Sequence, residues 1–194
     1  KVKEVWTNGE EIESEAFYRF KQLIREKRIP LSFPSSGYSR RFGDLEVKVL
    51  QTAVPDPYLS SMTDPWRRQN NHSLVLRIGR GGEHLLLSAD IEAEGEKRLL
   101  SSGMEIRGRI LQVPHHGSRT SSTEEFLRAV RPFWAVISGR SSPRLPLPHP
   151  EIIRRYEAAG VKLLRTDQEG AITFTNRRGN WKVESHRRGF ITAF

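Results

Sequence analysis

The sequence contains no cysteine, and this absence limits the chemistry that the chain can carry. Disulfides and thiolate metal ligands are excluded, so any metal ion would be held by histidine, aspartate or glutamate. The 194 residues also contain no apolar run near the ~20 residues of a membrane-spanning helix, and no signal-peptide pattern opens the chain. We therefore expect one domain, long enough to bury a core, without a membrane anchor of its own.

Acidic residues are in the minority, with 23 Asp and Glu against 32 Lys and Arg, so the formal net charge is +9. Such an excess attracts polyanions, and nucleic acid is the first candidate. Arginine dominates, as at sites that grip phosphate in a fork. The residues are scattered rather than blocked: Arg40, Arg41, Arg67, Arg68, Arg140, Arg144, Arg154, Arg155, Arg177 and Arg178. A merely solvated basic surface is the alternative explanation.

Hydrophobic periodicity predicts an α/β protein, because strands and helices alternate in the second half of the chain. A long loop of turn formers is expected over 54–71, and Ser122 with Glu125 forms a capping box for the helix that follows. The whole chain, 1–194, is expected to be one partial domain that ends in a β-hairpin and basic tail over 171–194. The expected strands are 2–6, 45–50, 73–78, 83–88, 110–113, 133–137, 161–164, 171–175 and 181–184, and the expected helices are 11–27, 91–100, 122–130 and 151–159.

Two adjacent histidines stand at the centre of the sequence, where an apolar run ends in Pro114, His115, His116 and Gly117. Side chains at the carboxyl end of a buried strand project into the crevice where open α/β sheets place their ligands. One imidazole can bind a metal ion while its neighbour orients or donates. Two histidines here favour a functional site over a packed core.

Two further candidates follow other strands. Asp90 follows the apolar run of the expected hairpin, where a buried carboxylate needs a partner or a cation. His149 precedes a helix that begins at Pro150. A carboxylate with imidazoles suits Zn²⁺ or Mn²⁺. The alternatives are that Asp90 caps the following helix and that His149 is a surface residue.

The string V-P-H-H-G-S-R-T-S-S resembles the metallo-β-lactamase-like domain at the C-terminal end of the ComEC family of bacterial DNA-uptake channel proteins. It is preceded by N-N-H-S-L-V-L-R and L-L-L-S-A-D-I-E and followed by P-H-P-E, in the family's order, and the resemblance covers about 2–172. It implies an αββα sandwich, of which this chain is the C-terminal half to two-thirds. It also implies metal-dependent phosphodiester hydrolysis, with DNA and the membrane channel portion of the parent as partners. The parent would lie in the bacterial cytoplasmic membrane, with this domain outside the cytoplasm.

The resemblance also implies roles for individual residues. Asp90 would bridge two ions of Zn²⁺ or Mn²⁺, one of His115 and His116 would be a ligand or a transition-state contact, and His149 would lie near the substrate phosphate. The catalytic candidates are His115, His116 and His149. The metal-binding candidates are Asp90 and His115. The substrate-binding candidates are Asn70, Asn71, Ser118, Arg119 and Thr120. The alternative for the two asparagines is a turn that starts the next strand.

The sequence also departs from the family pattern. The H-x-H-x-D-H metal motif is absent, Ser88 and Ala89 replace the usual Thr-Gly before Asp90, and Leu147 stands where a first late histidine would be. We therefore expect weak or no metal binding by this chain alone. The alternative is a degenerate, non-catalytic DNA-binding or structural module. A half-domain would also expose apolar sheet surface, so we expect dimerisation or poor solubility of this piece alone.

Overall fold

A seven-stranded sheet forms the centre of the computed structural model, which describes residues 1–53, 63–140, 142, 146–177 and 180–193. The strand order is β3-β4-β5-β6-β7-β8-β9. Neighbours from β3 to β6 are antiparallel, and neighbours from β6 to β9 are parallel. The strands are β3 (Ser39–Phe42), β4 (Leu45–Gln51), β5 (Val75–Arg80), β6 (Glu83–Leu87), β7 (Ile110–Gln112), β8 (Trp134–Ile137) and β9 (Lys162–Arg165).

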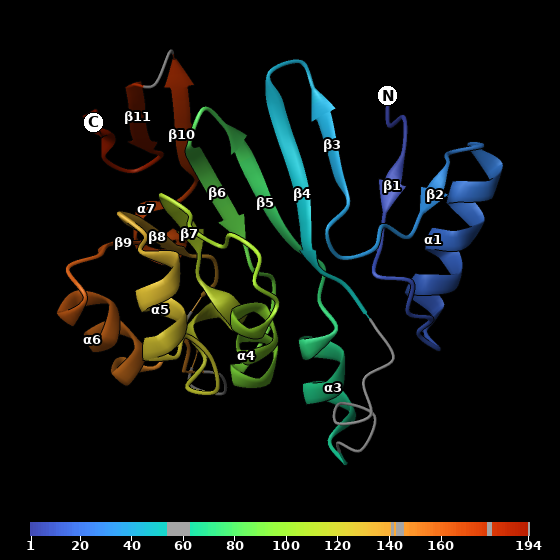
Figure 1. Cartoon of the computed structure of the whole chain (residues 1–194), viewed down its shortest axis with the longest axis horizontal. Helices are drawn as coiled ribbons and strands as arrows, with labels where there is room; N and C mark the ends of the chain where they lie inside the picture. Colours follow the sequence, from blue (N-terminus) through green and yellow to red (C-terminus); the bar gives the residue numbers. More distant parts are fainter. Residues whose placement is uncertain (54–62, 141, 143–145, 178–179, 194) are drawn as a thin grey trace.

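Three helices connect the parallel strands and cover one face of the sheet (Figure 1). They are α4 (Ala93–Ser101), α5 (Glu124–Val130) and α6 (Pro150–Ala158). Alternate residues of the strands, such as Leu86, Leu111 and Ala135, pack against these helices in the main core. This alternation is expected of strands buried on both faces, because successive side chains point to opposite sides.

The opposite face of β6 to β9 is covered by a second, antiparallel sheet of β10 (Ile172–Arg177), β11 (Asn180–Ser185) and β12 (Gly189–Ala193). Its Val183 packs with Ile110 and Trp134, which are the neighbours in sequence of the helix-facing residues. The short α7 (Thr166–Glu169) leads from β9 into this sheet. Residues 189–193, expected as part of a basic tail, therefore form a third strand.

The first 32 residues form a small unit, in which β1 (Val5–Trp6) and β2 (Leu31–Ser32) pair in parallel and α1 (Glu15–Glu26) lies between them in the sequence. This unit lies at the opposite end of the molecule from β10 and β11 (Figure 1). The ring of Trp6 contacts Tyr38 edge-on. In the described residues, no helix is long and apolar enough to cross a bilayer.

The α/β class, the hairpin of β5 and β6 and the expected order of strands and helices are confirmed. Besides the strand at 189–193, two local predictions are wrong. Residues 65–71, expected as loop, form α3 (Pro65–Asn71), which Asp64 caps. Thr123, not Ser122, caps α5. The expected loop residues 54–62, Arg144 and Arg178 lie outside the described residues.

Candidate active site at the ends of β6 and β7

The two histidines lie in a short 3₁₀ turn, η1 (Pro114–Gly117), directly after β7. Both adopt left-handed backbone conformations, with φ of 47° at His115 and 55° at His116, as does Ala89 after β6, with φ of 49°. Such conformations cost of order 1–3 kcal/mol in residues other than glycine and cluster at functional sites. The two strand ends therefore hold an unfavourable backbone shape that the surrounding contacts must stabilise.

Gln112, the last residue of β7, ties the two strand ends together. Its Oε1 atom accepts hydrogen bonds from the backbone N–H groups of Ser88, at 3.1 Å, and Ala89, at 2.9 Å. The N–H of His115 in turn donates to the Ala89 carbonyl at 3.0 Å. The positions of Asp90 and of the histidines are thus fixed relative to each other.

Asp90 and His116 face each other across this edge of the sheet. The His116 Nε2 atom lies 3.6 Å from Asp90 Oδ1, and both side chains are 43% exposed. The other ring nitrogen, Nδ1, bonds to the Ser138 carbonyl just after β8. Because a carbonyl can only accept, Nδ1 carries the hydrogen, and Nε2 is the nitrogen free to act at the site. Asp90 does not cap α4, because the cap position belongs to Glu92.

A second pair, Glu92 and His115, lies beside the first. His115 Nδ1 is 3.7 Å from Glu92 Oε1, and the rings of His115 and His116 are 6.5 Å apart. Glu92 is only 2% exposed. Sequence reasoning missed it, since a glutamate before a helix is expected to complement the helix dipole. The feature of the sequence that could have identified Glu92 is its position two residues after Asp90.

Helix α3 supplies the partners of Glu92. Asn70 donates to Glu92 Oε1 at 2.9 Å, and Arg67 Nε donates to Oε2 at 3.1 Å. Partial burial lowers the pKa of Arg67, but the carboxylates of Glu94 and Glu92 outweigh it and hold that pKa above its ordinary value. Asn71 is fully buried, and its Oδ1 accepts from the N–H groups of Glu92 and Gly95 at the start of α4. Asn70 thus reaches the site through Glu92, while Asn71 supports it from behind.

The loop of Ser118, Arg119 and Thr120 follows the histidines and forms the rim of the site. Ser118 and Thr120 hydrogen-bond through their hydroxyls at 3.0 Å, and Arg119 between them is exposed. Behind the rim, the buried Glu96 accepts the N–H of Thr123 at 2.8 Å and the N–H of Ser122. Burial raises the pKa of Glu96, partly offset by these hydrogen bonds.

His149 joins the same region through its backbone. Its N–H donates to the Gly117 carbonyl at 2.9 Å, and its ring Nδ1 accepts from the N–H of Glu151 at the start of α6, at 3.3 Å. Gly117 itself has φ of 79°, and a Cβ there would lie 2.7 Å from Pro148. This close approach explains why glycine follows the histidines.

The residues that are described contain no group of three or more His, Asp or Glu side chains arranged to hold a metal ion. Structural and catalytic zinc sites use three or four protein ligands. The Asp90–His116 pair offers two donors, and the Glu92–His115 pair is committed in part to Arg67 and Asn70. These residues therefore do not complete a metal site by themselves.

Comparison with known proteins identifies relatives of this chain among competence and recombination proteins. It is 33% identical over 164 residues to the ComE operon protein 3 of Bacillus subtilis, covering 84% of this chain and 20% of that protein. It is 40% identical over 119 residues to the competence protein ComA of Neisseria gonorrhoeae, covering 61% and 17%. It is 40% identical over 125 residues to recombination protein 2 of Haemophilus influenzae, covering 64% and 16%. The chain thus spans about a fifth or less of the length of these relatives.

Among solved structures, a candidate metal-dependent hydrolase from Parabacteroides distasonis aligns with a TM-score of 0.49 at 10% identity, over 84% of this chain and 64% of that one. The metallo-β-lactamase fold protein YhfI of Bacillus subtilis aligns with a TM-score of 0.41 at 7% identity, over 78% and 58%. No protein-family model matches the chain. The sequence relatives decide the assignment: the chain is a homologue of one segment of the ComEC and ComA competence proteins.

Proposed function

We propose that this chain forms part of a hydrolase domain that cleaves phosphodiester bonds of DNA within a DNA-uptake protein. The observation that carries the proposal is the pairing of Asp90 with His116 at the end of the parallel strands. Its relatives include a competence protein of Neisseria gonorrhoeae and recombination protein 2 of Haemophilus influenzae. A half-exposed imidazole beside a carboxylate is suited to proton transfer at a phosphate.

His116 would move the proton. Its Nδ1–H is held by the Ser138 carbonyl, so Nε2 would give a proton to the leaving oxygen or take one from the attacking water. Asp90 would stabilise the imidazolium that forms, because the opposite charge lies 3.6 Å away. His115 would orient Glu92, and His149 would approach the phosphate from the neighbouring loop.

Arg119, Ser118 and Thr120 would bind the phosphate oxygens. The exposed guanidinium supplies charged donors, and the two hydroxyls supply neutral ones. The net charge of +9 would draw the DNA strand toward this rim. Asn70, which donates to Glu92, would line the inner wall of the same region.

The resemblance implies Zn²⁺ or Mn²⁺, which would polarise the phosphate and activate water. Since the described residues do not complete a metal site, the remaining ligands would come from the sequence encoded upstream in a longer protein. Asp90 would then be this chain's ligand to the metal, and His116 would keep its Nε2 atom for proton transfer. We expect the chain alone to show weak metal binding and little cleavage.

Nuclease activity with Mn²⁺ on single- and double-stranded DNA tests the proposal in the protein extended upstream. We expect Asp90→Ala or His116→Ala to abolish cleavage, and we expect His186→Ala, in the turn between β11 and β12, to leave cleavage unchanged. Cleavage that persists in both site variants would refute the assignment of these residues.

A second candidate function is a DNA-binding module without chemistry. The incomplete set of metal donors and the charge of +9 favour it. The same assay separates the two functions. DNA binding without cleavage in the extended protein would establish this second function and exclude the first.

A further inference from the structure

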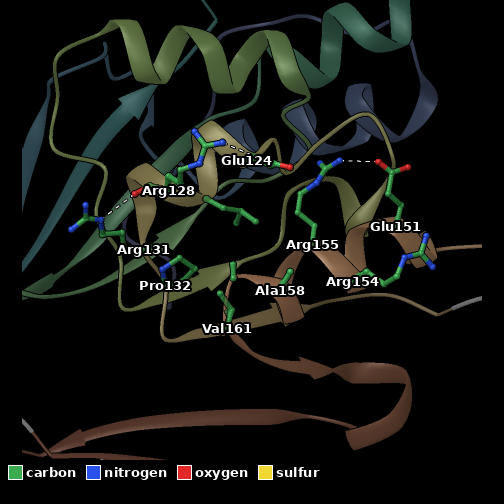
Figure 2. Close-up of a pocket in the computed structure, with 11 residues that line it drawn as sticks. Glu124, Arg128, Arg131, Pro132, Glu151, Arg154, Arg155, Ala158 and Val161 are labelled. Carbon is green, nitrogen blue, oxygen red and sulfur yellow. Dashed lines mark hydrogen bonds and ion pairs between the residues drawn. The ribbon is translucent and has the colours of Figure 1, made fainter.

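A groove of about 830 Å³ lies between α5 and α6, on the helical side of the sheet. Its floor is apolar and includes Leu127, Pro132 and Val161. Figure 2 shows Arg131 and Arg154 at opposite ends of the groove, with Pro132, Val161 and Ala158 between them. This volume is within the range of pockets that enclose a small ligand or a few side chains of a peptide.

The walls of the groove are basic. Four arginines and two glutamates line it, and each glutamate pairs with an arginine of its own helix: Glu124 with Arg128 and Glu151 with Arg155, both at 2.9 Å. These pairs leave two positive charges in excess. Among the residues that the structure describes, the other two arginines of the groove have no carboxylate partner. Arg131 donates to the Arg128 carbonyl at 3.2 Å, and Arg154 is exposed.

We propose that this groove docks an acidic peptide segment of a protein partner, one that carries an apolar side chain flanked by carboxylates. The apolar side chain would cover Leu127 and Val161, and the carboxylates would meet Arg131 and Arg154. A groove between two helices with an apolar floor is a common mode of peptide recognition. A bound nucleic acid fits less well, because the lining includes no aromatic ring on which a base could stack.

One wall residue links the groove to the candidate active site. Arg155 Nη1 donates to the Ser122 carbonyl at 2.7 Å, and its Nη2 pairs with Glu151. Ser122 belongs to the loop whose rim carries Ser118 and Thr120. Arg155 is therefore unsuitable as a test position, since its replacement would also disturb that loop.

The test measures binding of a fluorescently labelled, Glu-rich peptide of about a dozen residues with one leucine per helical turn. We expect the double variant Arg131→Glu/Arg154→Glu to weaken binding about tenfold or more, since two charge pairs become repulsions. Arg25→Glu/Lys27→Glu at the C-terminal end of α1 changes the net charge equally and should leave binding unchanged. Thermal unfolding of both variants confirms that they fold.

A single-stranded oligonucleotide of the same charge serves as competitor. If the proposal holds, the oligonucleotide does not displace the peptide from the groove, and its own binding is weakened equally in the two double variants. Equal loss of peptide binding in both variants would overturn the proposal. So would full displacement of the peptide by the oligonucleotide, which would identify the groove as a nucleic-acid site instead.

Discussion

His116 presents one ring nitrogen, Nε2, to Asp90 at 3.6 Å while the other is held by the Ser138 carbonyl. In the neutral ring, the Nε2 lone pair would face the carboxylate, and two acceptors repel. The pair is therefore attractive only when the ring is protonated or a cation lies between the two groups. Such an arrangement contributes little to the stability of the fold, and we infer that it serves proton transfer or cation binding instead.

Replacing Asp90 with asparagine should therefore leave stability almost unchanged. An ion pair between two side chains that are each 43% exposed contributes about 0–1 kcal/mol. We expect the free energy of unfolding of Asp90→Asn to stay within about 1 kcal/mol of the parent in urea denaturation. A loss well above this would mean that Asp90 is a structural residue, contrary to the proposed function.

Glu92 should behave differently, because it is buried and bonded. Glu92→Ala removes the acceptor of Asn70 and of the Arg67 Nε atom, and we expect a loss of about 1–3 kcal/mol in the free energy of unfolding. Glu94→Ala is the matched control, since this more exposed partner of Arg67 should cost less than about 1 kcal/mol. Equal effects of the two substitutions in chemical denaturation would contradict the assigned role of Glu92.

Much of the fold could be predicted from the local pattern of apolar and polar residues. The errors fall where contacts between residues distant in sequence determine the local structure. Both Ser122 and Thr123 can cap a helix, so the sequence around them does not choose. In the structure, Ser122 has φ of 59°, and its hydroxyl bonds to Tyr156, 34 positions later, at 3.0 Å. Thr123 is left to accept from Phe126 and to contact Glu96.

The candidate site shows the same division. Asp90, His115 and His116 could be selected because each follows an apolar strand, and a parallel sheet brings such ends together. Glu92 could not, since its partners Arg67 and Asn70 lie more than 20 residues away on α3. The sequence predicts loop there because Pro65 and the other prolines before it indicate turns, although Asp64 followed by Pro65 is also a helix start.

Glu96 predicts a pH dependence of stability. Burial raises its pKa above the ordinary value of 4.5, so the unfolded chain loses this proton at a lower pH than the folded chain. The stability that the group contributes is complete below about pH 4.5 and declines as the pH rises through the folded pKa. We expect the free-energy difference between the parent and Glu96→Gln, measured in urea from pH 4 to 7, to shift against the parent as pH rises. A constant difference would show that the carboxylate does not titrate in this range.

Self-association remains a prediction, and two side chains at the sheet edge support it. Phe42 and Leu45, which pair across β3 and β4, are 52% and 37% exposed. We expect the dimeric fraction to rise with protein concentration in analytical ultracentrifugation. We expect the double variant Phe42→Ser/Leu45→Ser to lower that fraction. Tyr18→Ser on α1, which is also exposed, is the control. A monomer at every concentration tested would refute the prediction.

Gly95 gives the sharpest test of how the site is supported. Alanine is the better helix former by about 1 kcal/mol, so propensity alone predicts that Gly95→Ala stabilises α4. A Cβ at this position, however, would lie 2.8 Å from Asn71 Oδ1 and 2.9 Å from the Cβ of Ile91. Both neighbours are fully buried and cannot move aside.

The expected result is a net loss of about 1–3 kcal/mol in the free energy of unfolding. Overpacking, together with weaker hydrogen bonds from the N–H groups of Glu92 and Gly95 to Asn71, exceeds the gain in helix propensity. Lys97→Ala, an exposed change on the same helix, should have almost no effect. In an Asn71→Ala background, the space beside Gly95 opens and Gly95→Ala should cost less. Additive effects in this double-mutant cycle would mean that Asn71 does not transmit the clash, and the strand end at Asp90 would then depend on other contacts.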